Sequence, residues 1–184
     1  MPDFPTLDLK MLPVIYSGSG VGIGPELAAY NSAAPASATY PATNRVLGIP
    51  FILTEVVTVT KLAAYNGATA NGNTDLGIYD ENFTKIVAIG NTAQAGTSAL
   101  QEFDITDTIL GPGRYYFVLK SDSATPTSTF FRWSTPPVNA LKLMGVWQNA
   151  GGAGSLAATY TPAVPASAYV PLVGMCIAPR TLLA

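Results

Sequence analysis

The sequence predicts an all-β fold: an antiparallel two-sheet β-sandwich of the jelly-roll type with an extended N-terminal arm. Short apolar runs rich in β-branched and aromatic residues recur along most of the chain, and Gly, Pro, Asn and Asp separate them roughly every ten residues. No segment has the periodicity of a long helix. We therefore divide the 184 residues into an arm over residues 1–45 and a sandwich domain over residues 46–184.

The strands of the sandwich follow from alternation and from turn signals. Side chains alternate clearly over Glu55–Ala64, and the pairs Asn66-Gly67, Asn71-Gly72 and Pro112-Gly113 mark turns. The predicted strands are Val46–Ile52, Glu55–Ala64, Asp75–Tyr79, Thr84–Ile89, Leu100–Ile105, Arg114–Ser121, Thr129–Trp133, Leu141–Gln148, Leu156–Thr161 and Tyr169–Ala178.

Residues 1–45 differ from the rest of the chain. Prolines recur there, glycines cluster at positions 18, 20, 22 and 24, and neither strand nor helix periodicity persists beyond a possible short strand at Leu12–Tyr16. Such a segment buries too little apolar surface to fold alone, yet it carries many apolar residues. We expect it to lie on another protein surface through Phe4, Leu7, Leu9, Met11, Leu12, Ile15 and Tyr16.

The composition favours a protein whose surface is largely covered by other protein molecules. Charged residues make up 11% of the chain and hydrophobic residues 48%, whereas about 25% charge is usual. The nine Lys and Arg residues are scattered, which argues against nucleic-acid binding. No apolar run approaches the roughly 20 residues of a membrane span, and the first residues do not resemble an export signal. An uncharged small β protein is the alternative.

Catalytic and cofactor motifs are missing from the sequence. The chain has no histidine, which removes the commonest general base, and its one cysteine, Cys176, is expected to be a buried small hydrophobe. The spacing of the glycines between residues 18 and 24 fits neither a dinucleotide fingerprint nor a P-loop. We therefore expect no enzymatic activity and no cofactor.

Two groups of oxygen-bearing side chains are candidates for catalysis or metal binding. Glu102 and Asp104 lie two apart on one strand face, as a hydrolytic pair could, but a solvated strand face explains them better. Four further side chains could bind calcium, although turn chemistry accounts for them without a metal. These are Asn71, Asn73, Asp75 and Asp80.

The aromatic residues leave a glycan-binding module open as an alternative. Tyr65, Tyr79, Tyr115, Tyr116, Tyr160, Tyr169 and two tryptophans could stack on a sugar, although aromatic residues in a sandwich more often belong to the core. This alternative would place Trp133 or Trp147 exposed, near the loops at Asp122–Ser128 or Gly151–Gly154.

The central part of the chain resembles a known class of proteins. Leu76-Gly-Ile-Tyr-Asp, followed by a short loop, an apolar strand and Leu110-Gly-Pro-Gly-Arg-Tyr-Tyr-Phe-Val-Leu, is similar to jelly-roll virion proteins of tailed bacteriophages. The resemblance is clear over Val46–Asp122 and looser in the C-terminal third.

The resemblance implies a structural role on a virus particle made in the host cytoplasm: capsid decoration or cement protein, head fibre, or tail component. It implies no catalytic residues, and such domains often form homotrimers. The expected partners are further copies of the chain and other virion proteins such as the major capsid protein. A fibre usually carries a coiled coil or a long repeat, and the sequence has neither, so decoration is favoured over a fibre or tail role.

Overall fold

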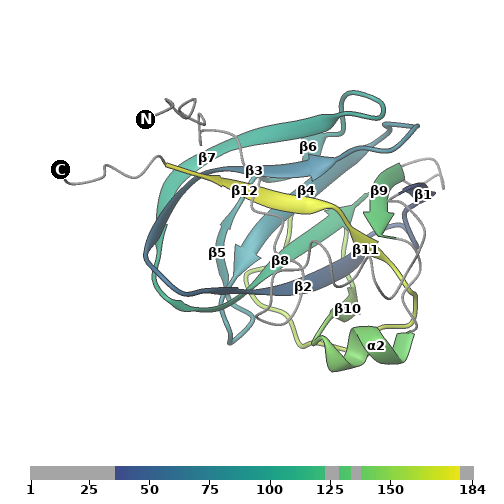
Figure 1. The fold of residues 1–184 in the computed structure, drawn as a ribbon. Coiled ribbons are helices and arrows are strands. Elements are labelled where there is room, and N and C mark those ends of the chain that lie inside the picture. The colour runs from purple at the N-terminus through teal and green to yellow at the C-terminus, as the bar shows by residue number, and fades with distance from the viewer. Residues whose placement is uncertain (1–35, 123–128, 134–137, 179–184) are drawn as a thin grey trace, which may run out of the picture.

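The protein is an all-β molecule of antiparallel sheets that pack against one another, as the sequence predicts (Figure 1). The computed structural model describes residues 36–122, 129–133 and 138–178. Within these ranges the strands are β1 (Ala36–Thr39), β2 (Arg45–Leu53), β3 (Val57–Tyr65), β4 (Asn73–Tyr79), β5 (Lys85–Ala88), β6 (Thr92–Ala93), β7 (Leu100–Leu110), β8 (Gly113–Ser121), β9 (Thr129–Trp133), β10 (Trp147–Ala150), β11 (Val170–Pro171) and β12 (Val173–Ile177), with one helix, α2 (Val138–Leu143).

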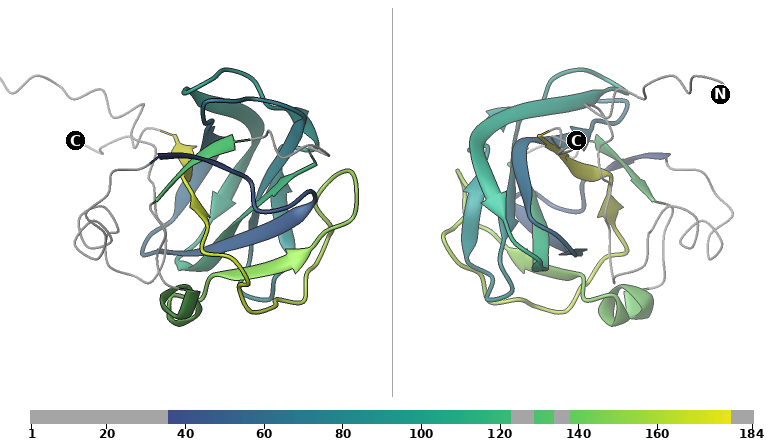
Figure 2. Two further views of the ribbon diagram at one scale, coloured as in Figure 1. Left: turned by 90° about the vertical axis from the view of Figure 1, so that its right-hand side faces the viewer. Right: turned by 60° about the vertical axis from the view of Figure 1, so that its left-hand side comes forward.

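The largest sheet has the strand order β10-β2-β8-β4-β5, and β6 also pairs with β4. Two three-stranded sheets, β12-β3-β7 and β1-β9-β11, complete the fold. Figure 2 shows the sheets curving around a common interior, with α2 at the periphery. The layers are therefore sandwich-like.

One folded ribbon links two of the sheets. β2 pairs with β8 up to Leu53 opposite Gly113, and β3 pairs with β7 from Val57 opposite Leu110. The β2–β3 and β7–β8 connections therefore lie side by side, where both pairs bend from the large sheet into the sheet β12-β3-β7 (Figure 1).

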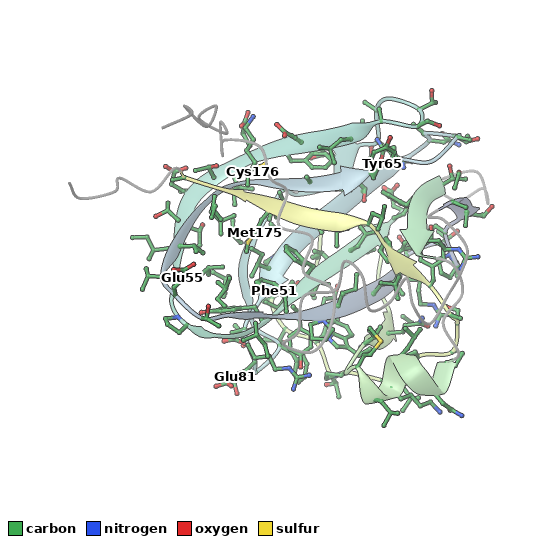
Figure 3. All side chains as sticks on the ribbon, viewed as in Figure 1. Phe51, Glu55, Tyr65, Glu81, Met175 and Cys176 are labelled. Carbon is green, nitrogen blue, oxygen red and sulfur yellow. The ribbon has the colours of Figure 1, made fainter. Side chains whose placement is uncertain are left out.

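The main core lies between the sheets. Alternate residues of β2, β4 and β8 point into it and meet apolar side chains from β3, β7, β9 and β12. Phe51 stacks on Phe117 with ring centroids 4.3 Å apart, and Phe51 is drawn at the interior in Figure 3. These residues alternate in sequence because a strand presents every second side chain to one face.

A second apolar cluster covers the opposite face of the large sheet. It contains Val46, Tyr79, Tyr116, Val118, Trp147 and Leu156. Lys85 N donates a hydrogen bond to Ala158 O, and Gln148 and Ala163 exchange backbone hydrogen bonds. The segment between residues 151 and 163 thus crosses this face and reaches both edge strands, β5 and β10.

Two predicted strands, Leu141–Gln148 and Leu156–Thr161, are wrong, except that Trp147 and Gln148 begin β10. Residues 138–143 form α2, because Val138 and the buried Leu141 are spaced for one helix face and Gly145, at φ 78°, supplies the left-handed end. Gly145 N donates to Lys142 O and Val146 N to Leu141 O, the hydrogen bonds of a Schellman motif. Leu156–Thr161 is no strand either, because it forms one isolated β-bridge, between Thr84 and Thr159, and no continuous ladder. Its apolar side chains pack on the large sheet instead.

The end of the predicted arm contributes to the packed fold. β1 pairs with β9, and Tyr40 is 6% exposed within the main core. Tyr40 Oη lies 2.9 Å from Leu119 O and 2.7 Å from Arg45 O. Burial among these groups raises the pKa of Tyr40 well above its usual value.

Candidate interaction surfaces

The arm residues expected to contact other proteins lie outside the described residues. They are Phe4, Leu7, Leu9, Met11, Leu12, Ile15 and Tyr16. Their docking on another protein therefore stays a prediction.

Glu102 and Asp104 lie on one face of β7, as expected, and share a lysine. Lys61 Nζ is 3.1 Å from Glu102 Oε2 and 3.6 Å from Asp104 Oδ1, and the hydrogen bond to Glu102 is the main reason that the pKa of Lys61 is raised. Both carboxylates face one cation across the sheet, which is the arrangement of a surface ion pair. Hydrolysis of a glycoside needs two carboxyl groups that flank a substrate.

Cys176 joins the edge of this cluster. Its Sγ lies 3.8 Å from Glu102 Oε1, and the residue is 8% exposed. Burial, followed by the negative charge of Glu102, raises the pKa of the thiol. Because the thiolate is the reactive form, this cysteine is a poor nucleophile near neutral pH, in agreement with its predicted role as a small buried side chain.

The residues considered for calcium do not converge. Asn73 N and Nδ2 donate to Asp122, Asp80 Oδ1 accepts from Asn82 N and Thr84 N within its own turn, and Asp75 Oδ2 accepts from Leu156 N. Asn71 N donates to Gln94 Oε1. Across the described ranges, no three His, Cys, Asp or Glu residues are grouped as metal ligands. Turn chemistry explains Asp80, whereas the contacts of Asn71, Asn73 and Asp75 join segments far apart in the sequence.

The expectation of an exposed tryptophan is wrong for Trp147, which is 3% exposed. Trp147 packs on Tyr160, Phe83 and Tyr116 beneath the segment between residues 151 and 163. The side chain of Trp133 lies outside the described parts of the structure. Tyr79, Tyr116 and Tyr169 are buried as well, so these four aromatic residues belong to packed clusters.

A buried acid and a buried lysine lie on neighbouring strands under the same covering segment. Asp75 on β4 pairs in register with Lys120 on β8, and both residues are at most 1% exposed. Leu156 N donates to Asp75 Oδ2 at 2.7 Å, and Lys120 Nζ donates to Gly152 O at 3.3 Å. Burial raises the pKa of Asp75 and lowers that of Lys120. The pair therefore fastens the segment to the sheet.

Three exposed aliphatic residues gather where the folded ribbon bends. They are Ile52, Val56 and Ile109, exposed by 41%, 63% and 73%, and together they form what we term the apolar corner. Val57 is opposite Leu110 and Thr58 is opposite Ile109, so Val56 and Ile109 are diagonal neighbours on the outer face, and Ile52 lies one residue along β2 from Leu53. Glu55, labelled at this end of the molecule in Figure 3, marks the β2–β3 connection.

Sequence reasoning missed the apolar corner, although a signal exists. Val56-Val57 and Ile109-Leu110 are apolar doublets at strand ends. Because consecutive residues of a strand face opposite sides, one member of each doublet must point outward when the other enters the core. The burial of Val57 and Leu110 fixes which member is exposed.

No helix within the described residues is long and apolar enough to cross a membrane. Comparisons of the chain with protein-family models, with curated proteins and with solved structures found no match.

Proposed function

We propose that this chain is a non-enzymatic structural protein of a bacteriophage virion, most closely suited to capsid decoration or cement, which assembles with itself and with neighbouring virion proteins. The apolar corner is the observation that carries the proposal. A single exposed aliphatic side chain is ordinary, whereas several exposed aliphatic side chains in one place mark a surface that another protein covers. Here they lie together on a chain with 11% charged residues.

The arrangement of the fold supports this role. In a jelly-roll connectivity the folded ribbon β2-β8 and β3-β7 forms the central hairpin, and the corner then lies at one tip of the sandwich. A tip presents a small surface to a shell of capsid subunits. The carboxylates of Glu102 and Asp104 lie elsewhere, on β7, and form ion pairs with Lys61. A tail component would use the same surface, and the site of attachment separates the two roles.

The test uses particles of a tailed phage that carries the gene for this chain. The gene is inactivated, and the full-length protein is supplied from a plasmid as wild type, Val56→Asp or Ile109→Asp. Val164→Asp is the matched control, because Val164 is 65% exposed and Val56 is 63% exposed. Purified particles are analysed by quantitative immunoblotting, and circular dichroism confirms that each variant folds.

We expect wild type and Val164→Asp to enter particles at a fixed ratio to the major capsid protein. Val56→Asp and Ile109→Asp should fall at least tenfold, because a buried carboxylate without a partner strongly disfavours an apolar contact. Immunogold labelling of the head supports decoration, and labelling of the tail supports the tail role. Absence of the wild-type chain from purified particles would overturn the proposal.

A further inference from the structure

We infer that the free edge of β12 takes up one extra strand, the segment Leu12–Tyr16 of a second copy of this chain. This inference rests on the proposed self-assembly and names the place where one copy holds the next. It starts from the edges of the described sheets, because an unpaired strand edge is a template for another strand.

The other long edges are guarded or covered. β7 carries Glu102, Asp104 and Asp107, and its register with β3 shifts between Asp104 and Thr108. Charges and bulges of this kind discourage strand addition. At the large sheet, the segment between residues 151 and 163 pairs with residues at both edges, β5 and β10.

Within the described residues β12 carries no charged side chain and no covering segment pairs with it, and its register with β3 shifts only at its C-terminal end, between Cys176 and Ile177. Its sequence, Val173-Gly-Met-Cys-Ile, contains no charged residue and no proline, and β3 is its one strand neighbour in this part of the chain. Tyr65 N donates to Leu172 O and Ala178 N donates to Thr58 O, so the even-numbered residues of β12 bond to β3. By the alternation of an antiparallel ladder, the backbone groups of Val173 and Met175 point to the opposite edge.

The side chains of this strand suit a buried position in a wider sheet. Val173 and Met175 enter the main core, and Cys176 on the outer face is 8% exposed (Figure 3). A strand that is apolar on both faces is typical of the interior of a sheet, whereas an edge strand usually carries polar residues.

The sequence of the arm matches this edge. Leu12-Pro-Val-Ile-Tyr16 is the one run of strand-forming residues in the predicted arm, and it is uncharged. An added strand becomes the new edge, where proline is accepted if its nitrogen points away from the ladder. Backbone groups of a strand point alternately to its two edges, so the nitrogens of Pro13 and Ile15 both point away from β12. The backbone groups of Val14 and Tyr16 then bond to β12.

The length of the intervening chain favours a second copy over the same copy. Residues 17–35 can span about 60 Å when extended, and a domain of this size is roughly 40 Å across. Connections inside a domain commonly need only about 2–6 residues. A spacer rich in Gly, Ala, Ser and Pro that is longer than the domain is suited to reaching a neighbour.

The experiment uses the full-length protein and two proline variants that differ by one position, Val14→Pro and Ile15→Pro. Light scattering gives the mass in solution, and NMR hydrogen exchange gives the protection of the Val173 and Met175 amides. In wild type we expect a mass above that of the monomer and protected amides whose exchange accelerates on dilution. Val14→Pro should give a monomer with at least tenfold faster exchange at both amides, and Ile15→Pro should behave as wild type.

Three results would overturn the inference: equal effects of the two prolines, rapid exchange of both amides in the wild-type oligomer, or protection of both amides in a wild-type monomer. The last result would assign the edge to the arm of the same copy. Failure here leaves the particle assay with Val56→Asp intact, since that variant changes the apolar corner and neither the arm nor β12. The two proposals therefore fail separately.

Discussion

Gly48 shows how a single residue fixes the packing of two layers. It lies on β2 opposite Trp147 of β10, with the indole directly over its Cα. A Cβ at this position would lie 2.0 Å from Trp147 Cε2, far inside van der Waals contact. Glycine is needed here for space, so that the tryptophan can close the second apolar cluster.

We therefore predict that Gly48→Ala lowers the free energy of unfolding by about 1–3 kcal/mol, because the indole must move and overpacked cores are strained. Urea denaturation followed by tryptophan fluorescence measures the loss. Gly111→Ala is the control, since no atom lies within 4 Å of its Cβ position. An equal loss for the two variants would contradict the packing argument.

At the scale of elements, the segment between residues 151 and 163 behaves as a third layer on the large sheet. Asp75 and Lys120 bind its backbone from two strands, and Tyr79 Oη donates to Ala157 O in the same segment. These polar contacts lie beside the second apolar cluster. The layer is therefore held by both apolar packing and buried polar groups.

We predict that Lys120→Met lowers the free energy of unfolding by about 1–3 kcal/mol at pH 7, because Gly152 O loses its hydrogen-bond donor and the buried carboxylate of Asp75 loses the attraction of a nearby cation. The double variant Asp75→Asn/Lys120→Met should recover part of that loss, since no charge remains. Urea denaturation of the two single variants, the double variant and wild type measures the coupling. A double variant less stable than Lys120→Met would contradict this account.

The pH dependence of the single variant follows from the raised pKa of Asp75. A carboxyl whose pKa is higher in the folded state binds more protons when folded, so stability falls as pH rises from its unfolded to its folded pKa. The deficit of Lys120→Met relative to the double variant should therefore shrink as the pH is lowered toward about 4, near the usual pKa of Asp. A deficit that grows toward low pH would reverse the sign of the argument.

At the scale of the whole molecule, the chain combines few charges with several exposed aliphatic residues, three of which form the apolar corner. Self-association of such a protein should depend on burial of apolar surface more than on ion pairs. The inferred addition of a strand to β12 has the same character, because backbone hydrogen bonds and apolar side chains carry it.

We predict that the mass in solution, measured by light scattering, stays the same between 0.1 and 1 M NaCl. Such salt screens charge pairs to a Debye length of about 3 Å but does not weaken apolar contacts. Lys61→Ala is the control, since it removes the cation shared by Glu102 and Asp104 without touching the apolar corner. A fall to monomer in high salt, or on Lys61→Ala, would show that ion pairs hold the assembly.

The sequence predicted the all-β class and most strands because their information is local. Arg114–Ser121 and Val46–Ile52 are apolar, β-branched runs bounded by turn residues, and β8 and β2 coincide with them to within one residue at each end. It failed at Leu141–Gln148, where an apolar run of this length fits a helix or a strand equally well. The Schellman hydrogen bonds around Gly145 decide that case, and they are visible only in three dimensions.

The sequence by itself determined the fold class, the turns, the absence of histidine chemistry and the low charge. Only the tertiary structure decided which candidate groups meet. It paired Glu102 and Asp104 with Lys61, separated Asn73, Asp75 and Asp80, and buried Trp147. The physical reason is that strand periodicity fixes the face on which a side chain lies. Which residues lie opposite, and which face another layer covers, depends on pairing between strands far apart in the chain.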